Sequence, residues 1–133
     1  MPLYFEFDHE NRVIRSRIEG TLNREALVEV NRKLAEYDAV MPARAGILDL
    51  SRVTSVDLSS KTMADLAARP PLVTNPERIR CIVAPSAHVF GMSRMFQMLG
   101  ENTRPNFHVL RSLEEAYALI DLKDPHFEPI QPE

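Results

Sequence analysis

Three short apolar runs, each followed by a stretch with helical periodicity, constrain this chain more than any other feature of its sequence. The runs cover residues 45–50, 79–84 and 107–110. Runs of this length are typical of strands buried in a parallel sheet. Consecutive parallel strands need a crossover connection, which is usually a helix, so the alternation predicts an α/β fold with a mostly parallel sheet.

The N-terminal segment predicts an antiparallel hairpin at the start of this sheet. Apolar and polar residues alternate over 3–7 and again over 13–18, and the turn-forming residues 8–11 separate the two stretches. Period-two alternation on both sides of a short polar break is typical of two paired strands. Gly20 is expected to end the second of them.

Four segments have the apolar spacing of amphipathic helices. They are residues 27–37, 58–68, 89–99 and 112–120. Thr21 or Asn23 is expected to cap the first helix, and Ser112 opens a capping box for the last. The predicted order is therefore ββαβαβαβα, a mixed, mostly parallel five-stranded sheet with an N-terminal hairpin and four helices.

The length and the proline distribution predict one domain followed by a tail. A chain of 133 residues has the size of a single domain. We assign residues 1–122 to one α/β domain. Residues 123–133 carry three prolines and little apolar periodicity, and we expect them to form a C-terminal tail.

The composition gives expectations about partners and compartment. The net charge of −3 gives no reason to expect nucleic acid or a membrane surface as a partner. No apolar run approaches the roughly 20 residues of a membrane span, and the N-terminus lacks the pattern of a signal peptide. One cysteine excludes an internal disulfide and favours a reducing compartment, so we expect a cytoplasmic protein. No cofactor motif appears, and the four histidines lack metal-ligand spacing.

Ligands of open α/β sheets bind beyond the carboxyl ends of the strands, which directs attention to residues 51–61. This stretch ends at the start of a predicted helix, where free backbone amides favour an anion. Asp57, Ser59 and Ser60 are its candidate binding residues. The alternative is that Asp57 or Ser59 only caps the helix.

A second candidate stretch, residues 85–94, follows the next predicted strand. Its candidate binding residues are Ser86, Gly91 and Arg94. Glycine inside a helix lowers stability by about 1 kcal/mol relative to alanine, so the presence of Gly91 in this helix needs an explanation. Close packing or a helix that begins at Gly91 would explain it, and so would a ligand whose anion pairs with Arg94.

The helix over 89–99 carries more apolar residues than one buried face needs. Met92, Met95 and Met98 extend them around the helix, and methionine is common on adaptable binding surfaces. Either the helix is buried on two sides or in a homodimer, or it presents a hydrophobic surface to a partner.

Residues 46–61, with the sequence GILDLSRVTSVDLSSK, resemble the signature of STAS domains, which sulfate transporters and anti-sigma-factor antagonists share. The predicted element order is also similar to the STAS order. Residues 84–96 and 114–119 resemble a group of small bacterial proteins described as sporulation-anti-sigma-antagonist-like. The resemblance implies a STAS-like fold and a regulatory role through a protein partner. It also implies a lipophilic ligand as an alternative, because this group is similar to Sec14-type lipid-binding modules.

In the antagonists that the chain resembles, a serine directly after the motif's aspartate is phosphorylated, and its charge abolishes partner binding. Leu58 stands at that position here, and Ser60 replaces the motif's glycine. Ser59 and Ser60 have hydroxyl groups, but the resemblance assigns the acceptor role to neither. We therefore do not expect the phosphorylation switch to operate.

Our leading hypothesis is a non-enzymatic STAS-like module that recognises a protein partner or a small amphipathic or anionic ligand. The first alternative is a small enzyme for acyl substrates that uses Ser59 or Ser60 with His88. It requires a hydrogen bond between a serine and the histidine, at about 2.6–3.2 Å. The second alternative is a purely structural homodimer formed through the methionine-rich helix.

Overall fold

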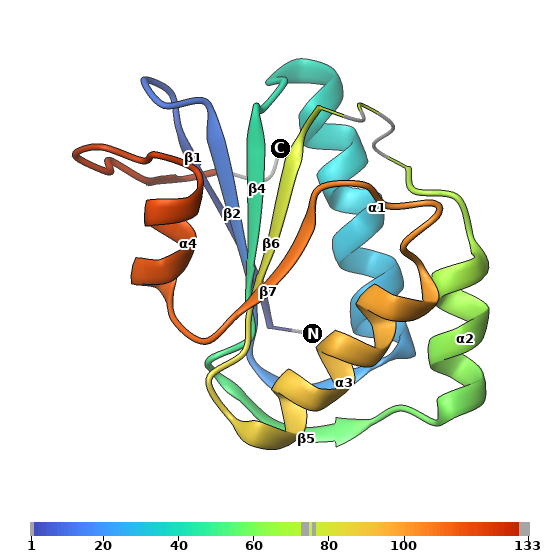
Figure 1. The fold of residues 1–133 in the computed structure, drawn as a ribbon. Coiled ribbons are helices and arrows are strands. Elements are labelled where there is room, and N and C mark those ends of the chain that lie inside the picture. Colours follow the sequence, from blue (N-terminus) through green and yellow to red (C-terminus); the bar gives the residue numbers. More distant parts are fainter. Residues whose placement is uncertain (1, 73–74, 76, 131–133) are drawn as a thin grey trace.

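The fold is built around a mixed β-sheet, seen edge-on in Figure 1. The computed structural model describes residues 2–72, 75 and 77–130. Within them the sheet has six strands in the order β7-β6-β4-β2-β1-β8. The strands are β1 (Leu3–Asp8), β2 (Val13–Ile18), β4 (Ala45–Asp49), β6 (Ile79–Val83), β7 (Phe107–Leu110) and β8 (Glu128–Pro129).

The predicted hairpin and parallel strands are confirmed. β1 pairs with β2 in antiparallel register, from Leu3 opposite Ile18 to Asp8 opposite Val13. β2, β4, β6 and β7 are parallel, with Ile14 beside Gly46 and Gly46 beside Arg80. The five strands predicted from the sequence are therefore present, and the fold class is the expected α/β class.

The strand count is higher than predicted because three short strands were missed. β3 (Gly20–Asn23) and β5 (Val53–Asp57) pair with each other in a second, parallel sheet. Gly20 begins β3 with a φ of 82°, a conformation that glycine adopts without strain, so it opens a strand as well as following β2. β8 is only two residues long and pairs with β1.

Four helices form where the apolar spacing predicts them. They are α1 (Arg24–Val40), α2 (Ser60–Ala68), α3 (Ala87–Leu99) and α4 (Leu113–Leu119). Asn23, not Thr21, caps α1, and its side chain accepts a hydrogen bond from the Ala26 amide at 2.8 Å. α2 begins at Ser60 instead of the predicted Leu58, and α3 begins four residues before Gly91.

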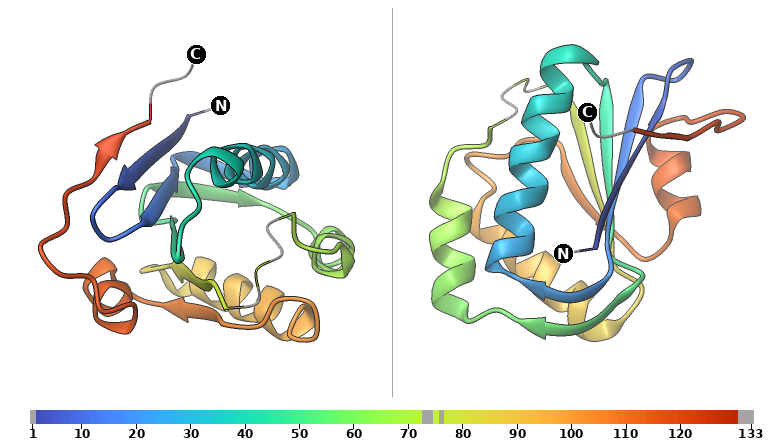
Figure 2. Two further views of the ribbon diagram at one scale, coloured as in Figure 1. Left: turned by 90° about the horizontal axis from the view of Figure 1, so that it is seen from above. Right: turned by 180° about the vertical axis from the view of Figure 1, so that it is seen from behind.

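The helices cover the two faces of the sheet unequally. α1, α2 and α3 lie on one face, and α4 alone lies on the other (Figures 1 and 2). We call these the three-helix face and the α4 face. Alternate residues of each strand point to opposite faces, so Ile47 of β4 packs on the α4 face and Leu48 on the three-helix face.

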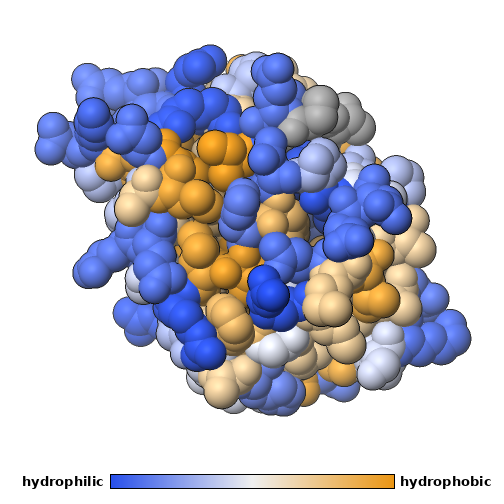
Figure 3. All heavy atoms as spheres, in the orientation of Figure 1, coloured by the Kyte–Doolittle hydropathy of each residue, from blue (hydrophilic) through white to orange (hydrophobic). Residues whose placement is uncertain are grey.

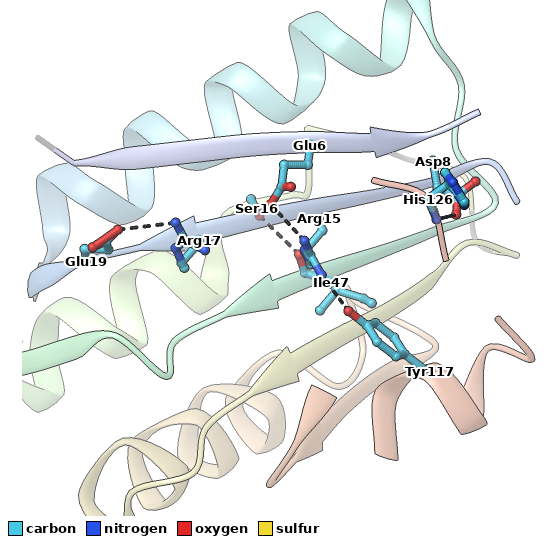
Figure 4. Close-up of polar contacts among 9 residues, drawn as sticks. All are labelled: Glu6, Asp8, Arg15, Ser16, Arg17, Glu19, Ile47, Tyr117 and His126. Atoms are coloured by element: carbon cyan, nitrogen blue, oxygen red, sulfur yellow. Dashed lines mark hydrogen bonds and ion pairs between the residues drawn. The ribbon is translucent and has the colours of Figure 1, made fainter. Parts of the chain in front are cut away.

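The α4 face is closed by a polar and aromatic cluster as well as by its apolar core. Arg15 of β2 donates hydrogen bonds to the Tyr117 hydroxyl at 2.6 Å and to Glu6 at 3.0 Å (Figure 4). Its guanidinium also lies 4.0 Å from the centre of the Phe127 ring. Burial alone would lower the pKa of Arg15, but the bonds to Glu6 and Tyr117 outweigh it and raise the pKa.

The segment predicted as a tail runs along the edge of the sheet as far as it is described. The Asp8 carboxylate accepts a hydrogen bond from the His126 amide at 2.8 Å (Figure 4), and the Ile130 amide donates to the Phe5 carbonyl at 2.9 Å. Residues 131–133 of the predicted tail lie outside the described residues.

β7 forms the edge of the sheet opposite β8, and all four of its residues are half-buried. The space-filling view shows hydrophobic residues along the middle of this side of the molecule, with hydrophilic residues around them (Figure 3). None of the described helices is both long enough and apolar enough to cross a membrane.

Candidate functional site

The first group of predicted site residues lies where α2 begins. Asp57 ends β5, and Ser59 is the cap of α2. The Ser59 hydroxyl accepts a hydrogen bond from the Thr62 amide at 3.0 Å and donates to the Thr62 hydroxyl at 2.9 Å. Ser60 is the first residue of the helix, and all three predicted site residues are exposed. Ser59 therefore acts as a helix cap and stays on the surface.

The second group lies on α3. Ser86 caps the helix and accepts a hydrogen bond from the Val89 amide at 3.3 Å. Gly91 is exposed, and a Cβ atom built on it would meet no other atom within 4 Å. Close packing therefore does not explain this glycine, and neither does a helix start, because α3 begins at Ala87.

The structure brings these two groups together only in part. α2 and α3 pack against each other, and both begin at the end of the molecule where β5 lies (Figure 1). Arg94 is directed elsewhere: it donates to Gln97 at 2.9 Å, and Gln97 donates to the Phe107 carbonyl of β7. Ser59, Ser60 and Ser86 thus share one end of the molecule, and Arg94 faces β7.

The three methionines of α3 have different environments. Met92 is half-buried and lines an internal cavity, Met95 is half-buried, and Met98 is 66% exposed. Leu99 beside it is 50% exposed. The apolar residues of α3 therefore extend from the interior to the surface. A homodimer through this helix stays a prediction.

His88 makes no hydrogen bond to Ser59 or Ser60 in the described part of the chain. The serine–histidine contact that the enzymatic alternative requires is therefore not formed there. Cys81 is 1% exposed, and burial raises the pKa of its thiol to about 11, so it is not a ready nucleophile. The described residues contain no group of three histidine, cysteine, aspartate or glutamate side chains that could hold a metal ion.

The three-helix face contains a cavity of about 240 Å³ between the sheet and α1, α2 and α3. Its walls are mainly apolar. They include Leu22, Leu27, Val30, Leu34, Leu48, Leu50, Leu58, Met63, Leu66, Ile82, Met92 and Phe96. The cavity reaches the surface at exposed residues of α1 and of the segment after α2, namely Asn31, Arg69 and Leu72.

Two small residues on neighbouring strands explain why the cavity forms there. Ser16 of β2 and Gly46 of β4 line it, where the other sheet residues of this face are large. The Ser16 hydroxyl donates to the Ile47 carbonyl at 3.3 Å, so its polar atom is satisfied by the sheet itself. The longer side chains of this face keep the helices away from the sheet. Where Ser16 and Gly46 lack such side chains, an empty space remains between the sheet and the helices.

Gly46 also makes room for a buried cation. Arg78 is 4% exposed and lines the cavity, and it donates to Asp38 at 2.6 Å. A Cβ atom on Gly46 would lie 3.0 Å from one terminal nitrogen of Arg78. The glycine therefore lets the guanidinium lie against β4. Burial lowers the pKa of Arg78, and the Asp38 carboxylate opposes that effect only in part.

Two further arginines face the same cavity. Arg80 lies on β6 in register with Gly46, and Arg104 donates to the Leu66 and Ala67 carbonyls at the end of α2. Burial lowers the pKa of both guanidinium groups, and the charges of Arg78 and Arg104 lower that of Arg80 further. Three guanidinium groups and one carboxylate, that of Asp38, therefore meet at this end of the cavity, which leaves an excess of positive charge there.

Comparisons with known proteins identify the fold. No protein-family model matches the sequence, and no curated protein matches it. A search of solved structures finds the anti-sigma factor antagonist SpoIIAA in its unphosphorylated form, with a TM-score of 0.59 and 16% sequence identity. The match covers 92% of this chain and all of that one. The fold is STAS-like.

Within this STAS-like fold, Leu58 occupies the position where the sequence resemblance places a phosphorylated serine. Its side chain is half-buried, packs with the core of the three-helix face and lines the cavity. Leu58 therefore contributes to the interior of this domain and offers no surface group for modification.

Sequence reasoning missed the arginines of the cavity in this STAS-like domain. They stand in the sequence among the arginines between 69 and 111, which resemble an ordinary charged surface. The local signal was Arg80, a charged residue inside an apolar run that otherwise predicts a buried strand. A buried strand rarely carries an arginine unless that charge has a partner or a function.

Proposed function

We propose that this domain is a non-enzymatic regulatory module that binds a protein partner at the end of the molecule where α2 and α3 begin. One observation carries the proposal. The STAS-like backbone extends over 92% of the chain and aligns with the whole of a protein described as an anti-sigma factor antagonist. The name of that protein describes a function that depends on recognition of another protein, and this supports partner recognition as the function proposed here.

The chemistry of this end favours an acidic group on the partner. Ser59 and Ser86 each satisfy one backbone amide of their helix, and the other amides of the first turn have no partner within the helix. Two helix N-termini at one end attract a carboxylate through their partial positive charge, an effect of about 0.3–1 kcal/mol for each helix. Ser60 is exposed beside them and can donate a hydrogen bond to such a carboxylate, whereas the exposed Asp57 carboxylate can only accept a hydrogen bond from a donor on the partner.

Gly91 extends this surface along α3. The space that a Cβ atom would occupy there is open, so a partner backbone can approach α3 closely at this position. A glycine that packing does not require is best explained by such an approach.

Phosphorylation is not part of the proposal. Leu58 has no hydroxyl group, and Ser59 already uses its oxygen to cap α2. Stoichiometric phosphate on Ser59 or Ser60 in the protein isolated from its own cells, detected by phosphate-affinity electrophoresis, would contradict this part of the interpretation.

Site-specific photo-crosslinking in the native cells tests the proposed surface. A benzophenone amino acid is placed at Ser60 or at Gly91, and at Glu36 as a control, because Glu36 is exposed on α1. We expect one and the same protein to be crosslinked from Ser60 and Gly91 and not from Glu36. Failure to obtain a shared adduct from the two sites, or the same adduct from Glu36, would contradict the proposal.

A further inference from the structure

The cavity of the three-helix face has two chemically different ends. β4 and β6 are parallel and in register, so residues at their starts lie at one end and residues after their ends lie at the other. Gly46, Arg78 and Arg80 lie at or before the second residue of these strands. Leu50 follows β4, and Leu58 follows β5, which pairs with β3 beyond that end of the sheet. The cavity therefore runs from a cationic end to an apolar end along the strands.

The apolar end suits a hydrocarbon chain. Leucine, isoleucine, valine and methionine side chains from the sheet and from three helices form its walls. A volume of about 240 Å³ exceeds the roughly 150 Å³ at which an apolar protein cavity accepts benzene. Methionines on two of the walls, Met63 and Met92, adapt to chains of different length and shape.

The cationic end suits an anionic head group. The guanidinium groups of Arg78, Arg80 and Arg104 line it, and the Asp38 carboxylate, which pairs with Arg78 and also acts on Arg80, offsets part of their charge. Burial lowers the pKa of Arg80, the charges of Arg78 and Arg104 lower it further, and the Asp38 carboxylate opposes them only in part. Guanidinium groups match carboxylate and phosphate oxygens in geometry as well as in charge. An anion between Arg78 and Arg80 would relieve the repulsion.

The lining of the cavity includes exposed residues of α1 and of the segment 69–72 after α2. Asn31, Arg69 and Leu72 line the cavity there, and Leu72 is 62% exposed. An amphiphile can therefore reach the interior without displacement of the sheet or of α4.

We propose that this cavity binds a single-chain amphiphile with an anionic head, of the fatty carboxylate or alkyl phosphate class. Its chain lies among the leucines and methionines of the three-helix face, and its head lies against Arg78 and Arg80. This site is separate from the proposed partner surface, and it is tested on the purified chain alone, so either proposal can fail without the other.

Calorimetric titration with decanoate, below the concentration at which it forms micelles, tests the proposal. Decyl phosphate is the second anionic probe, and decanol, decylamine and acetate are the controls for charge and chain. We expect decanoate, decyl phosphate or both to bind at least tenfold more tightly than every control. The arm that binds distinguishes a carboxylate from a phosphate head. Equal binding of decanoate and decylamine, or no binding of either anionic probe, would overturn the proposal.

Three variants locate the binding. Arg80→Met removes the charge and keeps most of the volume, and Arg52→Met is its matched control, because Arg52 is exposed and outside the cavity. Ser93→Leu places an apolar side chain into the cavity from α3. We expect at least tenfold weaker decanoate binding for Arg80→Met and Ser93→Leu, and a change below twofold for Arg52→Met. Unchanged binding in both cavity variants would show that the amphiphile binds elsewhere.

Methionine methyl groups report the position independently of any substitution. In a protein labelled with ¹³C at these methyl groups, decanoate is expected to shift the NMR signals of Met63 and Met92, which line the cavity. The signal of Met98, which is exposed, is expected to stay in place. A shift confined to Met98 would place the amphiphile on the surface and overturn the proposal.

Discussion

The two faces of this sheet are closed in opposite ways. On the α4 face, five strand residues are at most 2% exposed and pack with Ala116 of α4 and with Ile120 at its C-terminal cap. They are Val13, Ala45, Ile47, Cys81 and Val83. On the three-helix face, longer helices surround a cavity of about 240 Å³ that is lined by four arginines. The same strands supply both faces, so the difference comes from the side chains that each face presents and from the helices that cover it.

The difference between the two faces indicates that stability and binding depend on different parts of the molecule. A cavity of about 240 Å³ forgoes roughly 6 kcal/mol relative to a filled core, at about 24 cal/mol per Å³. That amount is comparable with the whole stability of a domain, about 5–15 kcal/mol. The three-helix face can forgo it because the core residues of the α4 face are almost completely buried. We therefore expect substitutions on the α4 face to affect mainly stability, and those on the three-helix face mainly binding.

The largest expected effect comes from two adjacent residues of β4. Ile47→Ala removes a side chain from the packed core and is expected to cost about 2–5 kcal/mol. Leu48→Ala faces the cavity, where fewer contacts are lost, and is expected to cost about half as much. Urea unfolding of both variants measures the difference. Equal costs would mean that the two faces are equally well packed.

The sequence predicted the elements that depend on local pattern. The hairpin, the central strands and the four helices follow from apolar spacing, and Ser112 caps α4 where the capping box places it. β3, β5 and β8 were missed because their pairing is long-range. Pro129 in β8 argues locally against a strand, yet residue 129 is tolerated on the edge of the sheet opposite Glu6.

The candidate site was less predictable than the fold. Ser59 and Ser86 were found because helix starts have a local signature. The cavity depends on Ser16, Gly46 and Arg80, which lie on three neighbouring strands. These residues are far apart in the sequence, so no local pattern indicates that they are close in space. Only the packed structure shows that these residues face the same space.

The next largest effect concerns Cys81, the reporter group of the α4 face. Burial raises the pKa of its thiol from 9.0 to about 11, so at pH 8 the thiolate population falls about a hundredfold. We expect native protein to react with a disulfide reagent at least a hundredfold more slowly than protein unfolded in urea. Rapid reaction of the native protein would mean that the α4 face opens easily, and it would remove the contrast between the faces.

The hydrogen bonds of Asp8 are expected to contribute less. This carboxylate accepts bonds from the His126 amide and from the Asn11 amide and side chain, and so holds the C-terminal segment against the hairpin. Burial alone would raise the pKa of Asp8, but these bonds outweigh it and hold the pKa below 3.8. Asp8→Asn places an amide NH₂ group opposite the N–H groups that the carboxylate now accepts from. This change is expected to lower the free energy of unfolding by about 1–3 kcal/mol at pH 7.

The pH dependence separates charge from shape in that cost. A carboxylate whose pKa is lowered by folding stabilises the native state fully at pH values well above 3.8, and this contribution is lost as the pH falls through the lower folded value. The stability difference between the parent protein and Asp8→Asn should therefore be constant from pH 7 to about pH 5 and shrink below pH 3.8. A difference independent of pH down to acid unfolding would attribute the cost to shape alone.

The smallest expected effect separates two glycines of the three-helix face. Gly91→Ala is expected to stabilise the protein by about 0.5–1 kcal/mol, because the added methyl group meets nothing and the helix gains propensity. Gly46→Ala is expected to destabilise it, because its Cβ atom would lie 3.0 Å from the buried Arg78 guanidinium. Thermal unfolding measures both changes. If Gly91→Ala is more stable and yet loses crosslinking from Ser60, the glycine is retained for the partner at the expense of stability, whereas Gly46 is retained for the cation beside it. A Gly91→Ala variant that is less stable would instead assign this glycine a structural role in α3.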